Sequence, residues 1–221
     1  DLKAASRSVP VPANARAAAG SDAHITIYQP SSNTLWEYFR FGGSSGNWSA
    51  NYGGVIRNVS RSRGVVPNHG ASASSLPIIG GTITIAEARR KVIPHALAMA
   101  VPEQFNGDVA PGQCTDGNAN VPGGVRSSTL RTIGDRFRLP ASLNIDAQPW
   151  PALTKAMARA AQRYGIIVRD KSGSVTFYGE APKSGDPWKS IYGGKQPSYF
   201  VDRFPWDKLQ LVKMGPITRR R

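Results

Sequence analysis

The sequence has a single cysteine, a modest share of charged residues and no long apolar run. Because Cys114 is the only cysteine among 221 residues, no disulfide can form within the chain. No apolar stretch approaches the roughly 20 residues that a membrane-spanning helix needs. Collagen is excluded as well, because glycine does not recur at every third position. With 40% hydrophobic residues, 23 glycines and 17 prolines, the composition favours a turn-rich, strand-rich globular protein.

Familiar catalytic and metal-binding motifs are also missing. The chain contains no P-loop, no G-x-S-x-G elbow, no H-E-x-x-H and no C-x-x-C pair, which argues against nucleotide hydrolysis and α/β-hydrolase chemistry. The three histidines, His24, His69 and His95, do not lie at the spacing of metal ligands on one strand or one helical turn. We therefore predict no metal site and no cofactor.

Acidic residues are scarce, and between Glu37 and Glu87 there are none. The formal net charge is +14 and the pI is about 10.4. This charge predicts attraction to polyanions such as an acidic polysaccharide or a cell-wall polymer. Nucleic acid is a less suitable partner, because the basic residues are spread thinly and only residues 219–221 form a basic run.

Residues 1–22 mix Ala, Ser and Pro without a sustained period, which predicts a flexible N-terminal tail. The sequence begins at Asp1 rather than Met, and we interpret this as a chain from which a leader peptide has been removed. The expected location is therefore secreted and extracellular. Residues 23–221 show no internal repeat and no second boundary, so we predict a single β-rich domain.

The opening of this domain predicts a β-hairpin. Residues 24–29 (HITIYQ) and 34–41 (TLWEYFRF) are rich in β-branched and aromatic side chains and flank a Pro-Ser-Ser-Asn turn. If Thr26 pairs with Glu37, His24 lies diagonally across from Glu37 on the same face, within reach of an imidazole–carboxylate hydrogen bond. A register shifted by one residue would place the two side chains on opposite faces.

Two later segments have clear periodicities. Residues 95–101 (HALAMAV) alternate large side chains with alanine, which predicts a buried central strand that is closely covered on its alanine face. Residues 151–164 predict an amphipathic helix, because apolar residues from Leu153 to Tyr164 share one face and Gly165 suits the C-terminal cap.

The remaining patterns predict more strands and loops. Residues 76–85 predict a strand that bends at its Gly-Gly pair, 135–146 a strand pair, and 166–169 with 174–178 a hairpin. Residues 104–128 predict a long loop. Together the segments predict a mainly β fold: an antiparallel β-sandwich, jelly-roll-like, with one amphipathic helix packed on it.

Three side chains are the predicted catalytic residues: Glu37, His24 and His95. Glu37 interrupts an apolar strand, and the two histidines, each at a strand start, suit general acid–base catalysis in a shared cleft. The alternative is structural: hydrogen-bonded histidines at strand ends and a glutamate on the solvent side of an alternating strand. For a glycosidase pair the sequence also offers Glu87, Glu103, Asp116, Asp146 and Asp170, without indicating which of them face each other.

Arg40, Trp36, Tyr52 and Arg57 are the predicted substrate-binding residues. A polysaccharide lyase needs a cation that neutralises a uronic acid and a base such as His or Tyr, and arginines supply the first role. Aromatic side chains at Trp36 and Tyr52 could stack on sugar rings, although such residues also serve ordinary packing.

Four phrases of the sequence carry a resemblance to known proteins: HITIYQPSSNTLWEYF, LPIIGGTITIAEARRKVIPHALAMAVP, RFRLPASLNID and AQRYGIIVRDKSG. Together they resemble a group of secreted, mostly actinobacterial, bacterial hypothetical proteins, over most of residues 22–212. The resemblance implies a secreted bacterial single-domain protein and assigns no chemistry. Cys114 stands where a basic residue is expected before Thr-Asp-Gly.

The sequence thus predicts a secreted bacterial protein that acts on carbohydrate, as a glycoside hydrolase or polysaccharide lyase on an extracellular polysaccharide, including an anionic one. It leaves open whether the protein is an enzyme at all. The alternative is a non-catalytic protein that binds the cell wall or another polyanion through its positive surface.

Overall fold

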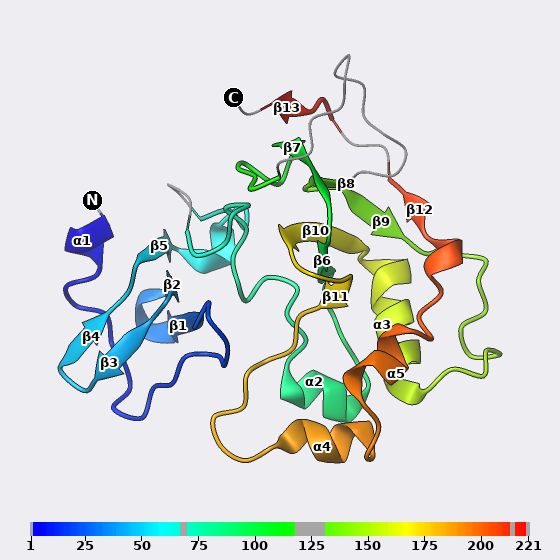
Figure 1. The fold of residues 1–221 in the computed structure, drawn as a ribbon, viewed down its shortest axis with the longest axis horizontal. Helices are drawn as coiled ribbons and strands as arrows, with labels where there is room; N and C mark the ends of the chain where they lie inside the picture. The colour runs from blue at the N-terminus through cyan, green and yellow to red at the C-terminus, as the bar shows by residue number, and fades with distance from the viewer. Residues whose placement is uncertain (1, 67–69, 118–130, 213–214, 220–221) are drawn as a thin grey trace.

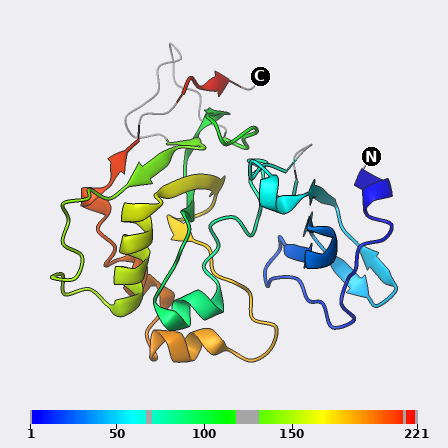
Figure 2. The same cartoon turned by 180° about the vertical axis from the view of Figure 1, so that it is seen from behind.

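The computed structural model describes residues 2–66, 70–117, 131–212 and 215–219. Figure 1 shows two lobes side by side, and Figure 2 shows the same arrangement from behind. We call residues 2–66 the N-terminal lobe, residues 70–82 the linker segment, and the described residues from 83 onward the C-terminal lobe. Each lobe has its own hydrophobic core.

The N-terminal lobe is built around a three-stranded antiparallel sheet in the order β1-β2-β5. Its elements are α1 (Leu2–Ala5), β1 (Ile25–Gln29), η1 (Pro30–Ser32), β2 (Thr34–Phe39), β3 (Gly42–Ser44), β4 (Asn47–Ser49), β5 (Tyr52–Arg57) and η2 (Val59–Arg61). The predicted hairpin is confirmed. Thr26 pairs with Glu37, which is the register that places His24 and Glu37 on the same face of the sheet. Strands β3 and β4 form a separate two-stranded ribbon.

The two faces of this sheet are covered differently. On one face Trp36, Tyr38 and Ile27 pack with Phe41 under residues of the N-terminal tail, including Val9 and Val11. The tail is also held by hydrogen bonds, since the indole N–H of Trp36 donates to the carbonyl of Ala5 at 3.0 Å. On the other face, Leu35 and Ile56 pack against Val66, and this face looks toward the linker segment.

The C-terminal lobe is centred on a five-stranded mixed sheet in the order β11-β6-β10-β9-β12. Its helices are α2 (Ile85–Arg90), α3 (Ala152–Arg163), α4 (Pro187–Tyr192), α5 (Pro197–Val201) and the short η5 (Trp206–Lys208). Its strands are β6 (Leu97–Val101), β7 (Gln104–Asp108), β8 (Arg131–Ile133), β9 (Arg136–Arg138), β10 (Ile166–Lys171), β11 (Thr176–Phe177), β12 (Gln210–Leu211) and β13 (Thr218–Arg219). Strands β13, β7 and β8 form a further small sheet.

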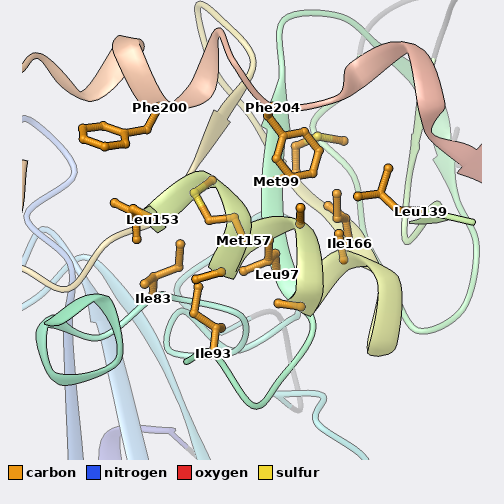
Figure 3. Close-up of a cluster of buried hydrophobic side chains, with 14 of the residues drawn as sticks. Ile83, Ile93, Leu97, Met99, Leu139, Leu153, Met157, Ile166, Phe200 and Phe204 are labelled. Atoms are coloured by element: carbon orange, nitrogen blue, oxygen red, sulfur yellow. The ribbon is translucent and has the colours of Figure 1, made fainter. Parts of the chain in front are cut away.

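The core of this lobe lies between α3 and the central sheet. Figure 3 shows Leu153 and Met157 of α3 in one cluster with Leu97 and Met99 of β6 and Ile166 of β10. The amphipathic helix predicted over 151–164 is therefore confirmed to within a residue at each end.

The alanine face of β6 is covered closely, as predicted. Ala98 and Ala100 are buried on the side away from the α3 core, and Gly81 of the linker segment lies against Ala98. Gly81 has φ +76°, and a Cβ there would stand 2.4 Å from the backbone nitrogen of Ala98. A larger residue at Gly81 or at Ala98 would push the linker segment off the sheet.

Several predicted elements were wrong. Residues 166–171 and 176–177 do not pair with each other, because β6 lies between them and is parallel to β10. The strand predicted over 76–85 is replaced by turns, with an isolated bridge from Ile83 to Gly179. The loop predicted over 104–128 begins with strand β7, and its part from 118 lies outside the described residues. Of the strand pair predicted over 135–146, β9 is formed.

The β-rich class is confirmed for the described residues, but a β-sandwich or jelly roll is not. The sheets are antiparallel or mixed, and none of those described closes on itself. The parallel pairs β6–β10 and β7–β8 do not belong to an antiparallel meander. Helices α4 and α5, which cover the core near Phe200, were not predicted either.

Candidate functional site

The linker segment joins the two lobes through a chain of buried hydrogen bonds. Glu37 of β2 accepts the backbone N–H of Ala71 at Oε1 and that of Ile78 at Oε2, both at 2.8 Å. The carbonyl of Ile78 in turn accepts from Nη1 of Arg169 in β10. Gly70 (φ +64°) makes the approach possible, because a Cβ there would lie 2.7 Å from Oε1 of Glu37.

Glu37 is completely buried, which corrects its predicted catalytic role. Its exposed fraction is 0%, and both carboxylate oxygens are used by backbone donors. Burial raises the pKa of this carboxyl, while the two N–H groups and Arg169 pull it back down. Glu37 therefore holds the linker segment against the sheet and faces no opening.

His24 lies beside Glu37 but does not contact it through the predicted imidazole–carboxylate bond. Instead, Nε2 of His24 lies 3.1 Å from the carbonyl of Ala71, the residue whose N–H Glu37 accepts. Because a carbonyl only accepts, Nε2 carries the proton and Nδ1 of the neutral ring keeps its lone pair. Burial lowers the pKa of His24, so the ring is a neutral base near pH 7.

A β-bulge in β10 places two charged residues on one face of the central sheet. Val168 is aligned with Met99 of β6, but Asp170, two positions later, is aligned with Ala100. The extra residue is Arg169, whose side chain reaches the linker segment. Asp170 follows on the alanine face, so an arginine and an aspartate that are adjacent in sequence face the same region.

Arg169 is fixed in a buried setting with 2% exposure. Its Nη1 donates to the carbonyls of Ile78, Gly80 (3.0 Å) and Pro77 (3.4 Å). Its guanidinium lies over the ring of Tyr178, with Cζ 3.6 Å from the ring centroid. Its Nε has no hydrogen-bond partner among the described residues.

Asp170 has a carboxyl whose pKa lies well above its ordinary value. Burial, reinforced by the negative charges of Asp116 and Asp22, raises its pKa from 3.8 to about 6, against the lowering effect of the Lys171 N–H and Arg169. Tyr178 is affected by the same charges, and burial raises its pKa to about 12. A carboxyl that is protonated close to neutral pH can donate a proton in a reaction.

Asp116 is exposed and lies on a segment that is docked on the linker segment. The N–H of Gln113 donates to the carbonyl of Ser74 at 3.1 Å, and Oγ of Ser75 contacts Sγ of Cys114 at 3.4 Å. This docking brings Asp116 into electrostatic contact with Asp170. The two carboxyls belong to different environments, one half-buried and one exposed.

A cavity of about 550 Å³ is lined by Arg169 and Tyr178, although not by Asp116 or Asp170, and we call it the junction cavity. It is lined by β1, by the linker segment, by Arg169 and Tyr178, and by residues 10–18 of the tail. His24 and Thr26 line it from the N-terminal lobe. A volume of this size is typical of small-molecule sites, which span about 300–1,000 Å³.

His95, the third predicted catalytic residue, does not reach the junction cavity. Nε2 of His95 lies 3.2 Å from Oε2 of Glu87, and Nδ1 lies 2.9 Å from the carbonyl of Ala96. Glu87 also closes the capping box of α2 with Thr84. His95 lines a second cavity of about 300 Å³, whereas His24 lines only the junction cavity of the two. We therefore assign His95 to the capping network of α2.

The predicted substrate-binding residues do not form one surface with Glu37. Trp36 is buried on the opposite face of the sheet, under the tail. Tyr52 is 67% exposed and lines a different cavity of about 450 Å³, together with Tyr38 and Trp48. Arg40 is exposed over the ring of Phe39, and Arg57 is exposed at the end of β5. Of these four, none lines the junction cavity.

Asp116 and Asp170 are among the candidate carboxylates of the sequence, but the sequence does not predict that the two interact. Their proximity depends on the bulge at Arg169 and on the docking of residues 112–117, neither of which has a local sequence signal. The one available hint is an Arg-Asp pair at the end of an apolar strand, where a buried cation and acid interrupt the hydrophobic pattern.

Other kinds of site are absent from the described part of the chain. No group of three His, Cys, Asp or Glu residues there is arranged to hold a metal ion. None of its helices is long and apolar enough to cross a membrane. Comparison with protein-family models, with curated proteins and with solved structures finds no match for the chain, so the chemistry of this site is argued from its own residues.

Proposed function

We propose that the protein is a secreted bacterial carbohydrate-active enzyme that cleaves a glycosidic bond at the junction cavity. Asp170, which follows Arg169 of the cavity wall, is the proposed general acid, and Asp116 is the proposed second carboxylate; neither side chain is part of the cavity lining itself. The observation that carries the proposal is a buried carboxyl, Asp170, directly after Arg169 of the cavity wall; its burial and the charge of Asp116 raise its pKa to about 6. A carboxyl that keeps its proton near a second carboxyl is an arrangement that glycoside hydrolases use.

The chemistry assigned to each group follows from its surroundings. Asp170 remains partly protonated in mildly acidic solution, so it can protonate the oxygen of the leaving sugar. Asp116 is exposed, and the role proposed for it is to activate water or to stabilise positive charge at the anomeric carbon. Arg169 and Tyr178 line the junction cavity and stack on each other, and Arg169 is the part of this wall that is next to Asp170 in the sequence.

The alternative to hydrolysis at the same cavity is β-elimination, the reaction of polysaccharide lyases. His24 is neutral, with an unprotonated Nδ1, and it lines the cavity together with the cation of Arg169. A base and a cation are what β-elimination from a uronic acid requires. Hydrolysis and elimination give different products, because only elimination leaves an unsaturated sugar that absorbs in the ultraviolet.

A panel of neutral and uronic polysaccharides tests the proposal, with released reducing ends and ultraviolet absorbance measured in parallel. Asp170→Asn and Asp116→Asn should each lower turnover by at least about 100-fold, the typical contribution of a general acid or base. Asp146→Asn is the matched control, because Asp146 is exposed and paired with Arg159 away from the cavity. Equal turnover in Asp170→Asn and the wild type would refute the assignment.

The second candidate is binding without catalysis to a polyanion such as a cell-wall polymer. It is favoured by the acid-free stretch between Glu37 and Glu87, in which Arg57, Arg61 and Arg63 are all exposed. Binding of this kind is sensitive to salt and insensitive to Asp170→Asn. Salt-dependent retention on an anionic polymer, with no turnover on the panel, would favour it over the enzyme.

A further inference from the structure

The junction cavity is lined by more positive than negative charge. Among its described lining residues are three cations, Arg16, Lys183 and Arg169, and one carboxylate, Glu180. Oε2 of Glu180 already accepts the backbone N–H of Ile85 at 2.8 Å, so it is committed to the start of α2. Arg16 and Lys183 are exposed, whereas Arg169 is buried in the wall.

Two buried polar atoms in this wall have no partner among the described residues. One is Nε of Arg169, and the other is Oγ1 of Thr26 on β1. The guanidinium of Arg169 contacts carbonyls and an aromatic ring, and no carboxylate of the described residues lies within 4 Å of it. Polar groups buried without partners are unfavourable, and such groups in a cavity wall commonly contact a ligand.

A bound oxyanion would account for both the excess of cations and the unpartnered polar atoms. An oxyanion accepts hydrogen bonds from N–H and O–H donors, and it is attracted by all three cations. It could accept a hydrogen bond from the hydroxyl of Thr26, while the exposed cations Arg16 and Lys183 would attract it from solution.

We propose that the junction cavity binds the oxyanion group of an acidic sugar, which makes an acidic glycan the substrate class of the site. This inference rests on the proposed function and narrows it. Arg16 and Lys183 attract the anion at the entrance, and Thr26 and Arg169 receive it at the wall. The volume of about 550 Å³ lies within the range of sites that hold small ligands.

The anion can be a carboxylate, a sulfate ester or a phosphate, and the test separates these sources. Isothermal titration calorimetry at low salt measures binding of trigalacturonate, of a sulfated trisaccharide, of a glycerol-phosphate oligomer and of neutral galactotriose. We expect at least one acidic ligand to bind about tenfold or more tightly than galactotriose, the combined scale of two or three favourable charge contacts. The acidic ligand that binds most tightly identifies the source.

Two double variants locate the binding. Arg16→Ala with Lys183→Ala removes the exposed cations of the cavity and should weaken binding of the acidic ligand about tenfold or more, because two charge contacts are lost. Arg89→Ala with Arg90→Ala is the matched control, since it removes the same charge from exposed positions on α2, and it should leave binding unchanged. Thr26→Val, which keeps the shape of the side chain, should weaken binding several-fold.

Each remaining outcome overturns the inference. Equal binding of acidic and neutral trisaccharides removes the anionic preference but leaves a sugar site that is compatible with the proposed enzyme. Equal loss in the cavity and control variants shows attraction to net charge alone. No binding of any acidic ligand refutes the inference directly, whereas failure of the proposed function appears separately, as unchanged turnover in Asp170→Asn.

Discussion

Replacing Asp170 with asparagine should make the protein more stable at high pH while it removes activity. The folded state favours the protonated carboxyl, because its pKa is raised from 3.8 to about 6. A group of this kind stabilises the fold below its unfolded pKa, and that contribution is lost as the pH rises from about 4 to about 6. Asparagine stays neutral throughout and keeps an acceptor oxygen for the N–H of Lys171.

The expected size follows from the shift. A rise from 3.8 to about 6 corresponds to about 3 kcal/mol of preference for the neutral form. Because Asp170 is half-buried, water and salt attenuate part of this preference, and we expect Asp170→Asn to be about 1–3 kcal/mol more stable than the wild type at pH 8. At pH 3.5 the two proteins should be equally stable, because both side chains are then neutral.

Urea unfolding at several pH values between 3.5 and 8 measures this difference directly. The difference should grow from near zero through the interval from about 4 to 6 and then remain constant. Asp146→Asn, at an exposed ion pair, is the control and should change stability by less than about 1 kcal/mol throughout. A variant that is less stable at pH 8, or a difference independent of pH, would refute the reasoning.

Three further outcomes are expected. Glu37→Ala leaves two buried N–H groups without an acceptor and should lower the free energy of unfolding by about 3–5 kcal/mol in urea titrations, and a loss below about 1 kcal/mol would contradict its role. His24→Gln should reduce the stability lost between pH 7 and 5, since the lowered pKa of His24 makes its protonation destabilising below about 6.5; equal losses in variant and wild type would argue against this. His95→Ala should keep turnover within about twofold and lower stability by about 1 kcal/mol, whereas loss of turnover would return His95 to the site.

Local sequence patterns correctly predicted the helix and the strand whose hydrophobic periodicity reflects packing on a single core. The alternation of residues 95–101 and the amphipathic face of residues 151–164 were both confirmed, because each reflects one element packing on one core. Of the two registers left open, the one that pairs Thr26 with Glu37 is formed, and a four-residue turn from Pro30 to Asn33, with Asn33 in the left-handed region, connects the two strands.

Long-range arrangement was the part that the sequence could not supply. Residues 166–169 and 174–178 were predicted to pair with each other, but β10 and β11 both pair with β6, a choice that depends on strands far apart in the chain. Glu37 was expected to face a cleft, whereas the linker segment, nearly forty residues away, folds over it and occupies both of its oxygens. The same covering segment brings Asp116 close to Asp170, which no local pattern records.

The proposed function depends on a carboxyl, that of Asp170 next to Arg169 of the cavity wall, that holds its proton close to neutral pH. Carbon-13 NMR of the aspartate side chains, with Asp170→Asn used to assign the signal, measures that property without any substrate. We predict a titration midpoint of about 6 for Asp170. A midpoint near the ordinary 3.8 would contradict the account, because Asp170 would then be ionised wherever the enzyme is proposed to work.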